Sequence, residues 1–104
     1  MQLTSRYRDF SGASIVEAAH MELAEPSIKT AFAKCVEQGA TKIICHPYFL
    51  SRGRHVKKDI PELVAEAAKE NPFVTYTITD PLGAQQGVLN LIDLSIKNID
   101  RNST

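Results

Sequence analysis

Hydrophobic residues along the chain follow two alternating patterns, which predict strands and helices in turn. Apolar positions recur at helical spacing in three stretches: 26–39, 60–68 and 84–99. Three short apolar runs rich in β-branched residues alternate with them and are typical of strands: 14–20, 41–47 and 73–79. Repeated strand–helix alternation predicts parallel strands joined by helical crossovers, and hence an α/β sandwich.

Residues that start and stop helices set the expected boundaries. We expect Pro26 at the first position of the first helix and Gly39 just past its end. Asp59 and Glu62 have the spacing of a capping box for the second helix, and Pro61 is tolerated in its first turn. These residues predict helices of ordinary length.

The ends of the predicted sheet suggest that it is incomplete. The run 41–47 lacks alternation, so we expect that strand to be buried on both faces. Leu3, Tyr7 and Phe10 have helical spacing, so the chain is expected to begin inside a helix. Three parallel strands leave two exposed edges. We therefore expect a further strand, or a second copy of the chain, to pair with them.

Composition narrows the class of protein. The chain has 104 residues, 43% hydrophobic and 23% charged, with zero formal net charge, which fits one domain spanning residues 1–104. This balance argues against bulk nucleic-acid binding, and no apolar run approaches the roughly 20 residues that span a membrane. Cys35 and Cys45 lie in apolar patterns without metal-site spacing and are expected to be reduced core residues.

Three loops are expected to carry the chemistry, because open parallel sheets bind ligands at the carboxyl ends of their strands. These loops are 20–26, 47–55 and 79–87. The middle loop places His55 among cationic side chains: Arg52, Arg54, Lys57 and Lys58. Neighbouring cations and a helix N-terminus disfavour imidazolium, and a neutral ring can accept a proton or ligate a metal. A surface histidine in a solvated basic turn remains the alternative.

Other polar residues near strand ends have similar alternatives. Glu22 follows the first run in phase with His20, and together they could help ligate a divalent ion, although Glu22 could also be a solvated loop acid. His46 ends the second run and is expected to be a hydrogen-bonded core residue rather than a ligand. Glu25 is favourably placed at a helix N-terminus. The cationic residues of the middle loop could pair with substrate carboxylates or phosphates.

Four motifs occur in an order and spacing that together resemble one family: "EAAHMELAEPSI" (17–28), "CVEQGATKI" (35–43), "PYFLSRGRHVKKDIPEL" (47–63) and "ITDPLG" (78–83). The chain is similar to the small sirohydrochlorin chelatases, class II tetrapyrrole chelatases that insert cobalt or iron into sirohydrochlorin. The segment "AHMELAEPSIK" is most similar to the cyanobacterial and plastid branch of this family, which makes sirohaem.

The resemblance implies roles for individual residues. His55 matches the family histidine that ligates metal and accepts pyrrole protons, and Glu22 matches the acidic metal ligand. Arg52, Arg54 and Lys57 would bind the carboxylates of the tetrapyrrole, and we add His20 to this substrate-binding group. The implied metal is Fe²⁺ or Co²⁺ as a substrate of sirohaem or cobalamin synthesis, with no permanently bound cofactor.

The resemblance also implies an architecture. The family has a three-layer sandwich with a parallel sheet, related to the flavodoxin-like arrangement, and it opens with a strand that ends in a histidine within "HGSR". That first strand and its histidine are not found in this sequence, so we expect an N-terminally truncated domain. We also expect it to form a homo-oligomer, a dimer, in the cytoplasm or plastid stroma. The alternatives are a non-catalytic metal- or tetrapyrrole-binding remnant and a generic α/β interaction module.

Overall fold

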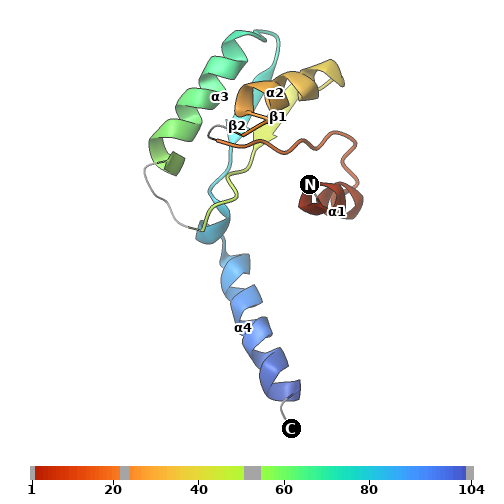
Figure 1. Cartoon of the computed structure of the whole chain (residues 1–104), viewed down its shortest axis with the longest axis vertical. Coiled ribbons are helices and arrows are strands. Elements are labelled where there is room, and N and C mark those ends of the chain that lie inside the picture. The colour runs from red at the N-terminus through yellow and green to blue at the C-terminus, as the bar shows by residue number, and fades with distance from the viewer. Residues whose placement is uncertain (1, 22–23, 51–54, 103–104) are drawn as a thin grey trace.

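Helices and strands alternate along the chain in a computed structural model that describes residues 2–21, 24–50 and 55–102 (Figure 1). The elements are α1 (Gln2–Ser11), α2 (Ile28–Glu37), β1 (Lys42–Cys45), a π-helical turn η1 (His55–Asp59), α3 (Ile60–Lys69), β2 (Thr75–Ile78), a 3-10 turn η2 (Leu82–Ala84) and α4 (Gln86–Asn102). None of the described helices is long and apolar enough to cross a membrane.

The sheet is parallel, as the alternation predicts. β1 and β2 pair in the register Lys42↔Thr75 to Cys45↔Ile78. The backbone ladder extends past both ends of the strands, because the Thr75 amide donates to the Thr41 carbonyl at 3.1 Å and the Thr79 amide donates to the Cys45 carbonyl at 2.9 Å. The fold is therefore α/β with a parallel crossover through α3.

Residues 14–20 do not form the predicted strand. Within the described chain, residues 14–20 make one isolated parallel β-bridge, between His20 and Ser27. The His20 amide there donates to the Pro26 carbonyl at 2.7 Å. A strand needs a neighbouring backbone to bond with, and the described sheet contains β1 and β2 alone. The sequence of this run favours extended backbone, but local preference cannot supply a partner.

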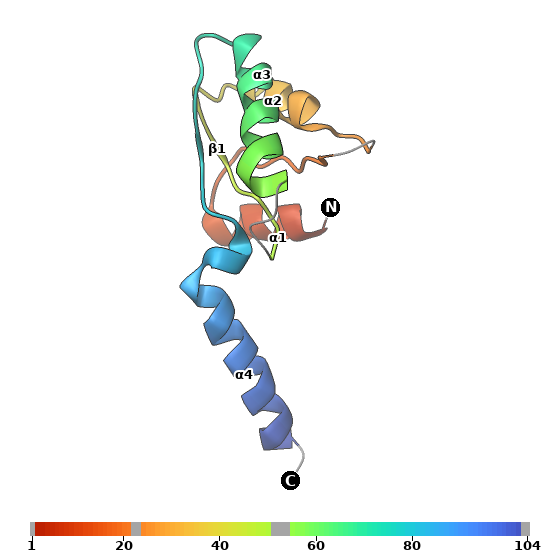
Figure 2. The ribbon, with the colours of Figure 1, turned by 90° about the vertical axis from the view of Figure 1, so that its left-hand side faces the viewer.

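α2 and α3 pack together on one face of the sheet (Figure 2). The buried core consists of Phe32 from α2 with Ile60, Val64 and Ala67 from α3, and Ile43, Cys45, Val74 and Ile78 of the sheet region pack against it. The prediction that residues 41–47 are buried on both faces is wrong, since Ile44 is 63% exposed. The described elements thus build two layers of the sandwich, the sheet and one pair of helices.

Helix ends differ in part from expectation. Ser27, not Pro26, caps α2, and its hydroxyl accepts from the Thr30 amide at 3.1 Å. Gly39 follows the helix with φ +103°, a left-handed conformation that suits glycine. Asp59 forms no side-chain cap, because it has helical backbone angles and α3 continues directly from η1. The predicted capping box is therefore wrong.

α1 and α4 lie away from the core (Figures 1 and 2). The predicted N-terminal helix is confirmed as α1, yet Phe10 on it is 88% exposed. α4 makes its substantial contacts with η2, and its residues 89–99 are all exposed. Both helices therefore carry exposed apolar side chains in the isolated chain.

Candidate functional site

Two of the three predicted loops meet at the carboxyl edge of the sheet. β1 and β2 end at the paired residues Cys45 and Ile78, so residues 46 and 79 begin their loops side by side. The Leu82 amide donates to the Pro47 carbonyl at 3.1 Å, and the Gly83 amide donates to the Phe49 carbonyl at 2.9 Å. Segments 47–50 and 79–84 thus form one shared loop platform.

Gly83 is required for this close approach of the two loops. A Cβ atom at this position would overlap the carbonyl group of Leu50. The glycine of the "PLG" motif therefore lets the backbone of one loop contact the backbone of the other.

His46 and Thr79 interact across this edge. The His46 Nδ1 atom lies 2.8 Å from the Thr79 hydroxyl oxygen, which lies 3.0 Å from the Asp80 carbonyl oxygen. The ring of His46 is exposed. The sequence-based interpretation of His46 as a hydrogen-bonded core residue is thus right about the hydrogen bond and wrong about the core.

His55 is the first residue of η1, which confirms its predicted position near the start of a helical segment. Figure 1 shows the η1–α3 segment beginning toward the end of the sheet to which both strands run. Lys57 is exposed in the same turn. Glu22, Arg52 and Arg54 lie outside the described residues, as does the side chain of His55, so their predicted roles are untested.

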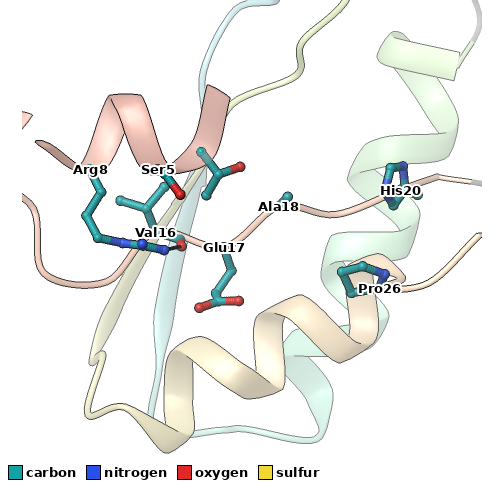
Figure 3. A pocket seen from close by; sticks show the side chains of 8 residues that line it. Ser5, Arg8, Val16, Glu17, Ala18, His20 and Pro26 are labelled. Atoms are coloured by element: carbon teal, nitrogen blue, oxygen red, sulfur yellow. Dashed lines mark hydrogen bonds between the residues drawn. The ribbon is translucent and has the colours of Figure 1, made fainter. Parts of the chain in front are cut away.

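His20 belongs to a separate hollow between α1 and the extended segment (Figure 3). The cavity has a volume of about 230 Å³, and its lining includes Arg8, Glu17 and His20. The Arg8 guanidinium donates to the Val16 carbonyl at 2.7 Å, and the Glu17 carboxylate accepts from the side-chain Nε2 of Gln38 at 3.0 Å. Arg8 and Glu17 are thus engaged in contacts within the chain, and no described contact joins His20 to Lys57.

Glu25 has the local role that its position predicts. Its carboxylate accepts from the Ser27 amide at 3.3 Å and from the Thr30 hydroxyl at 3.1 Å. These bonds serve the first turn of α2, where an acid is favourable. Glu25 is therefore engaged in holding the helix start.

A second hollow, of about 250 Å³, lies between Met21 and the first turns of α3, and Asp59, Glu62 and Glu66 line it. The sequence-based reasoning missed this acidic face. Among the described residues, however, no group of three histidine, cysteine or acidic side chains could hold a metal ion. The hollow is notable because Met21 immediately precedes Glu22.

Both cysteines are free and half-buried. Burial raises the pKa of the Cys45 thiol, and burial followed by the nearby Glu17 carboxylate raises the pKa of Cys35. A raised pKa keeps a thiol protonated and poor as a metal ligand. Cys45 packs against the core as predicted, whereas Cys35 is not among the residues that do, and the expectation that both thiols stay reduced in the cell is untested.

The sequence could have indicated the His46–Thr79 pair, because the two residues occupy equivalent positions. Each is the first residue after one of two strands, and parallel strands end at the same edge. The sequence does not reveal the register in which β1 pairs with β2, and this register is needed to predict the contact. Pairing Cys45 with Ile78 is what brings these two side chains into contact.

The CbiX family model matches residues 1–99. The chain belongs to the CbiX family. It is 46% identical over 97 residues to the chloroplastic sirohydrochlorin ferrochelatase of Arabidopsis thaliana, covering 93% of this chain and 43% of that protein. It is also 36% identical over 85 residues to the sirohydrochlorin ferrochelatase of Bacillus subtilis, covering 82% of this chain and 33% of that protein. The resemblance inferred from the motifs is thereby confirmed.

Solved structures support the fold. A cobalamin biosynthesis CbiX protein from Marinobacter aquaeolei superposes with a TM-score of 0.71 at 30% identity, over 96% of this chain and 85% of that one. The sirohydrochlorin chelatase SirB from Bacillus subtilis, in complex with cobalt, superposes with a TM-score of 0.78 at 33% identity, over 94% of this chain and 42% of that one. The chain thus spans less than half the length of several relatives and most of the length of another.

Proposed function

We propose that this CbiX-family chain inserts a divalent first-row metal, Fe²⁺ or Co²⁺, into sirohydrochlorin at the carboxyl edge of its sheet. The observation that carries the proposal is the convergence of the loops after β1 and β2, with η1 starting at His55 toward the same end. Relatives with sirohydrochlorin ferrochelatase and cobaltochelatase activity support the reaction class. Imidazole and carboxylate donors suit both metals, so the donor set does not choose between them.

The reaction requires two exchanges. The macrocycle loses two pyrrole N–H protons, and the metal leaves its own ligands for the four ring nitrogens. We assign His55 to metal binding and to accepting a pyrrole proton, and Glu22 to metal binding. His55 is the first residue of η1, and a neutral imidazole can both bind a metal and accept a proton.

Cationic residues would hold the substrate. Sirohydrochlorin carries many carboxylates around a flat ring, and guanidinium groups bind carboxylates through two parallel hydrogen bonds. We assign this role to Arg52, Arg54 and Lys57. His20 is the weaker member of the group, because the structure places it in a different hollow, beside Arg8 and Glu17.

We further propose that two copies of the chain associate. The accessible surface is 7874 Å², whereas a compact protein of 11.5 kDa exposes about 5,800 Å². The radius of gyration is 16.2 Å, against about 13 Å for a compact domain of this length. A standard interface buries about 800 Å² on each partner, so the surplus is large enough for one.

The apolar stripe of α4 is the surface we assign to the second copy. Ile92, Ile96 and Ile99 recur at helical spacing along one side and are 52%, 57% and 70% exposed. Ile44, which is 63% exposed, adds an apolar side chain on the bare face of the sheet. A two-fold dimer in which the helix of each copy covers apolar surface of the other would bury both. We place the protein in the cytoplasm or plastid stroma, in keeping with its chloroplastic relative.

The experiment is metal insertion followed by the absorbance of sirohydrochlorin, with Co²⁺ or Fe²⁺ and with an enzyme-free reaction beside it. The wild-type chain should exceed the enzyme-free rate. His55→Ala should return the rate to background, and Lys57→Gln should raise KM with little change in kcat. Lys69→Gln is the matched control, because Lys69 is an exposed lysine in the last turn of α3, the helix that follows η1.

A wild-type rate equal to background would refute the catalytic proposal. If that chain still bound sirohydrochlorin or the metal, the alternative of a non-catalytic binding protein would be favoured instead. Equal losses in Lys57→Gln and Lys69→Gln would show that positive charge in general, and not the position of Lys57, binds the substrate.

A further inference from the structure

His46 has no assigned role, yet its exposed ring is hydrogen-bonded to the end of the neighbouring strand. It is the first residue after β1, its ring is exposed, and its Nδ1 atom lies 2.8 Å from the Thr79 hydroxyl oxygen. Thr79 is in turn the first residue after β2. The ring is therefore tied to the neighbouring strand at the edge where the two loops meet.

The hydrogen bonds around Thr79 determine which ring nitrogen carries the proton. The Thr79 hydroxyl has one hydrogen, and it lies 3.0 Å from the Asp80 carbonyl oxygen, which can only accept. Both contacts are hydrogen bonds only if Thr79 donates to Asp80 and the Nδ1–H of His46 donates to Thr79. The opposite tautomer would place two oxygens 3.0 Å apart with no hydrogen between them.

This tautomer leaves the Nε2 atom of His46 with a free lone pair. Within the described part of the chain, the ring makes no second polar contact, and it is exposed to solvent. The Asp80 carbonyl also accepts from the side-chain Nε2 of Gln85 at 3.1 Å, which fixes the turn that holds Thr79. A ring oriented through one nitrogen and open at the other has the arrangement of a metal-ligating histidine.

We propose that His46 is a further ligand for the divalent substrate metal, binding it through Nε2, with Thr79 as the residue that positions the ring. The inference rests on the proposed function, because it places His46 at the site where the metal is handed to the macrocycle. The proposed function assigns two donors to this metal, from His55 and Glu22, whereas protein sites for such metals commonly use three or more. His46 would supply a third donor from the edge where β1 and β2 end.

A purely structural role explains the observations less well. An exposed hydrogen bond at the surface contributes little to stability, since both groups can bond to water instead. A structural histidine would moreover be indifferent to substitution by asparagine, whose side-chain N–H can take the place of Nδ1–H. The two roles therefore separate in a metal-binding measurement.

The test is titration of the metal-free full chain with Co²⁺ alone, followed by calorimetry and by the cobalt absorption bands. His46→Asn keeps the donor to Thr79 but removes Nε2, and we expect its Co²⁺ affinity to fall about 100-fold. Thr79→Val should lower affinity about 10-fold by freeing the ring, while Thr79→Ser should bind as wild type. Urea unfolding of His46→Asn and Thr79→Ser should match wild type, because His46 is exposed and serine keeps the hydroxyl of Thr79.

His55→Ala separates this inference from the proposed function. Wild-type affinity in His46→Asn together with weak binding in His55→Ala would overturn the inference and leave the proposed function intact. Weak binding in His46→Asn with wild-type affinity in His55→Ala would support His46 and contradict the role assigned to His55. Wild-type protein that fails to bind Co²⁺ would contradict both.

Discussion

Replacing Phe32 by leucine tests the packing that holds the site edge in place. Phe32 lies on α2, is 4% exposed, and contacts the sheet through Tyr76 with ring centroids 6.5 Å apart at an interplanar angle of 76°. This edge-to-face pair joins α2 directly to β2. Leucine conserves most of the volume of phenylalanine but cannot make the aromatic contact.

The expected loss of stability comes from two sources. A near-isosteric core replacement costs up to about 1.5 kcal/mol, and the aromatic pair contributes about 0.5–1.5 kcal/mol beyond the burial of area. We therefore expect the free energy of unfolding to fall by about 2 kcal/mol. In urea, with a slope near 2 kcal/mol per molar, this lowers the midpoint by about 1 M.

The assay is urea unfolding at one fixed protein concentration, because association would couple stability to concentration. Phe73→Leu is the matched control: Phe73 is 93% exposed, and its replacement should change stability by less than about 0.5 kcal/mol. A double-mutant cycle with Tyr76→Leu should give a coupling of about 0.5–1.5 kcal/mol. Equal effects at Phe32 and Phe73, or zero coupling, would refute the assignment of Phe32 to the core.

Three other predictions concern the loops, the thiols and the assembly. Gly83→Ala should lower the free energy of unfolding by about 1–3 kcal/mol, whereas Gly87→Ala, which has open space around it, should leave it equal or higher; a reversed order in urea would contradict the close loop contact. Because burial raises the pKa of Cys45, the unfolded chain loses its thiol proton first, so stability should fall as pH rises above about 8.5 and should fall less steeply in Cys45→Ala. A slope unchanged by that substitution would remove Cys45 as its cause. Ile92→Glu should convert the dimer to a monomer in sedimentation equilibrium while Asn90→Glu does not, and a wild-type monomer at all concentrations would exclude the assembly.

The helices and the parallel sheet could be predicted from the sequence because their signals are local or nearly so. The stripe containing Phe32 predicted α2, and β-branched residues predicted β2. Residues 14–20 show where this reasoning fails: the same local preference is present, but hydrogen bonding to a neighbouring strand decides whether a strand forms. Ile44 shows a second limit, since an apolar run cannot reveal whether both faces of the sheet are covered.

The candidate site was predictable in outline from topology. The rule for parallel sheets selected the loops after β1 and β2, and their contact is confirmed. The rule could not rank the polar residues within those loops. His46 was taken for a core residue because a histidine inside an apolar run is usually buried, and only the strand register reveals its contact with Thr79. His20 was grouped with the substrate residues, yet it lies beside Arg8 in a different hollow.

Paramagnetic mapping tests the central claim most directly, namely that the metal enters at the carboxyl edge of the sheet. Amide spectra of isotope-labelled full chain would be recorded during titration with Co²⁺, whose unpaired electrons broaden and shift nearby signals. We predict that His46, Thr79 and the first residues of η1 respond first, while Gly39 and Asn71, just before the amino ends of β1 and β2, stay unchanged. Changes centred on Gly39 and Asn71, or on the hollow beside Arg8, would contradict the account.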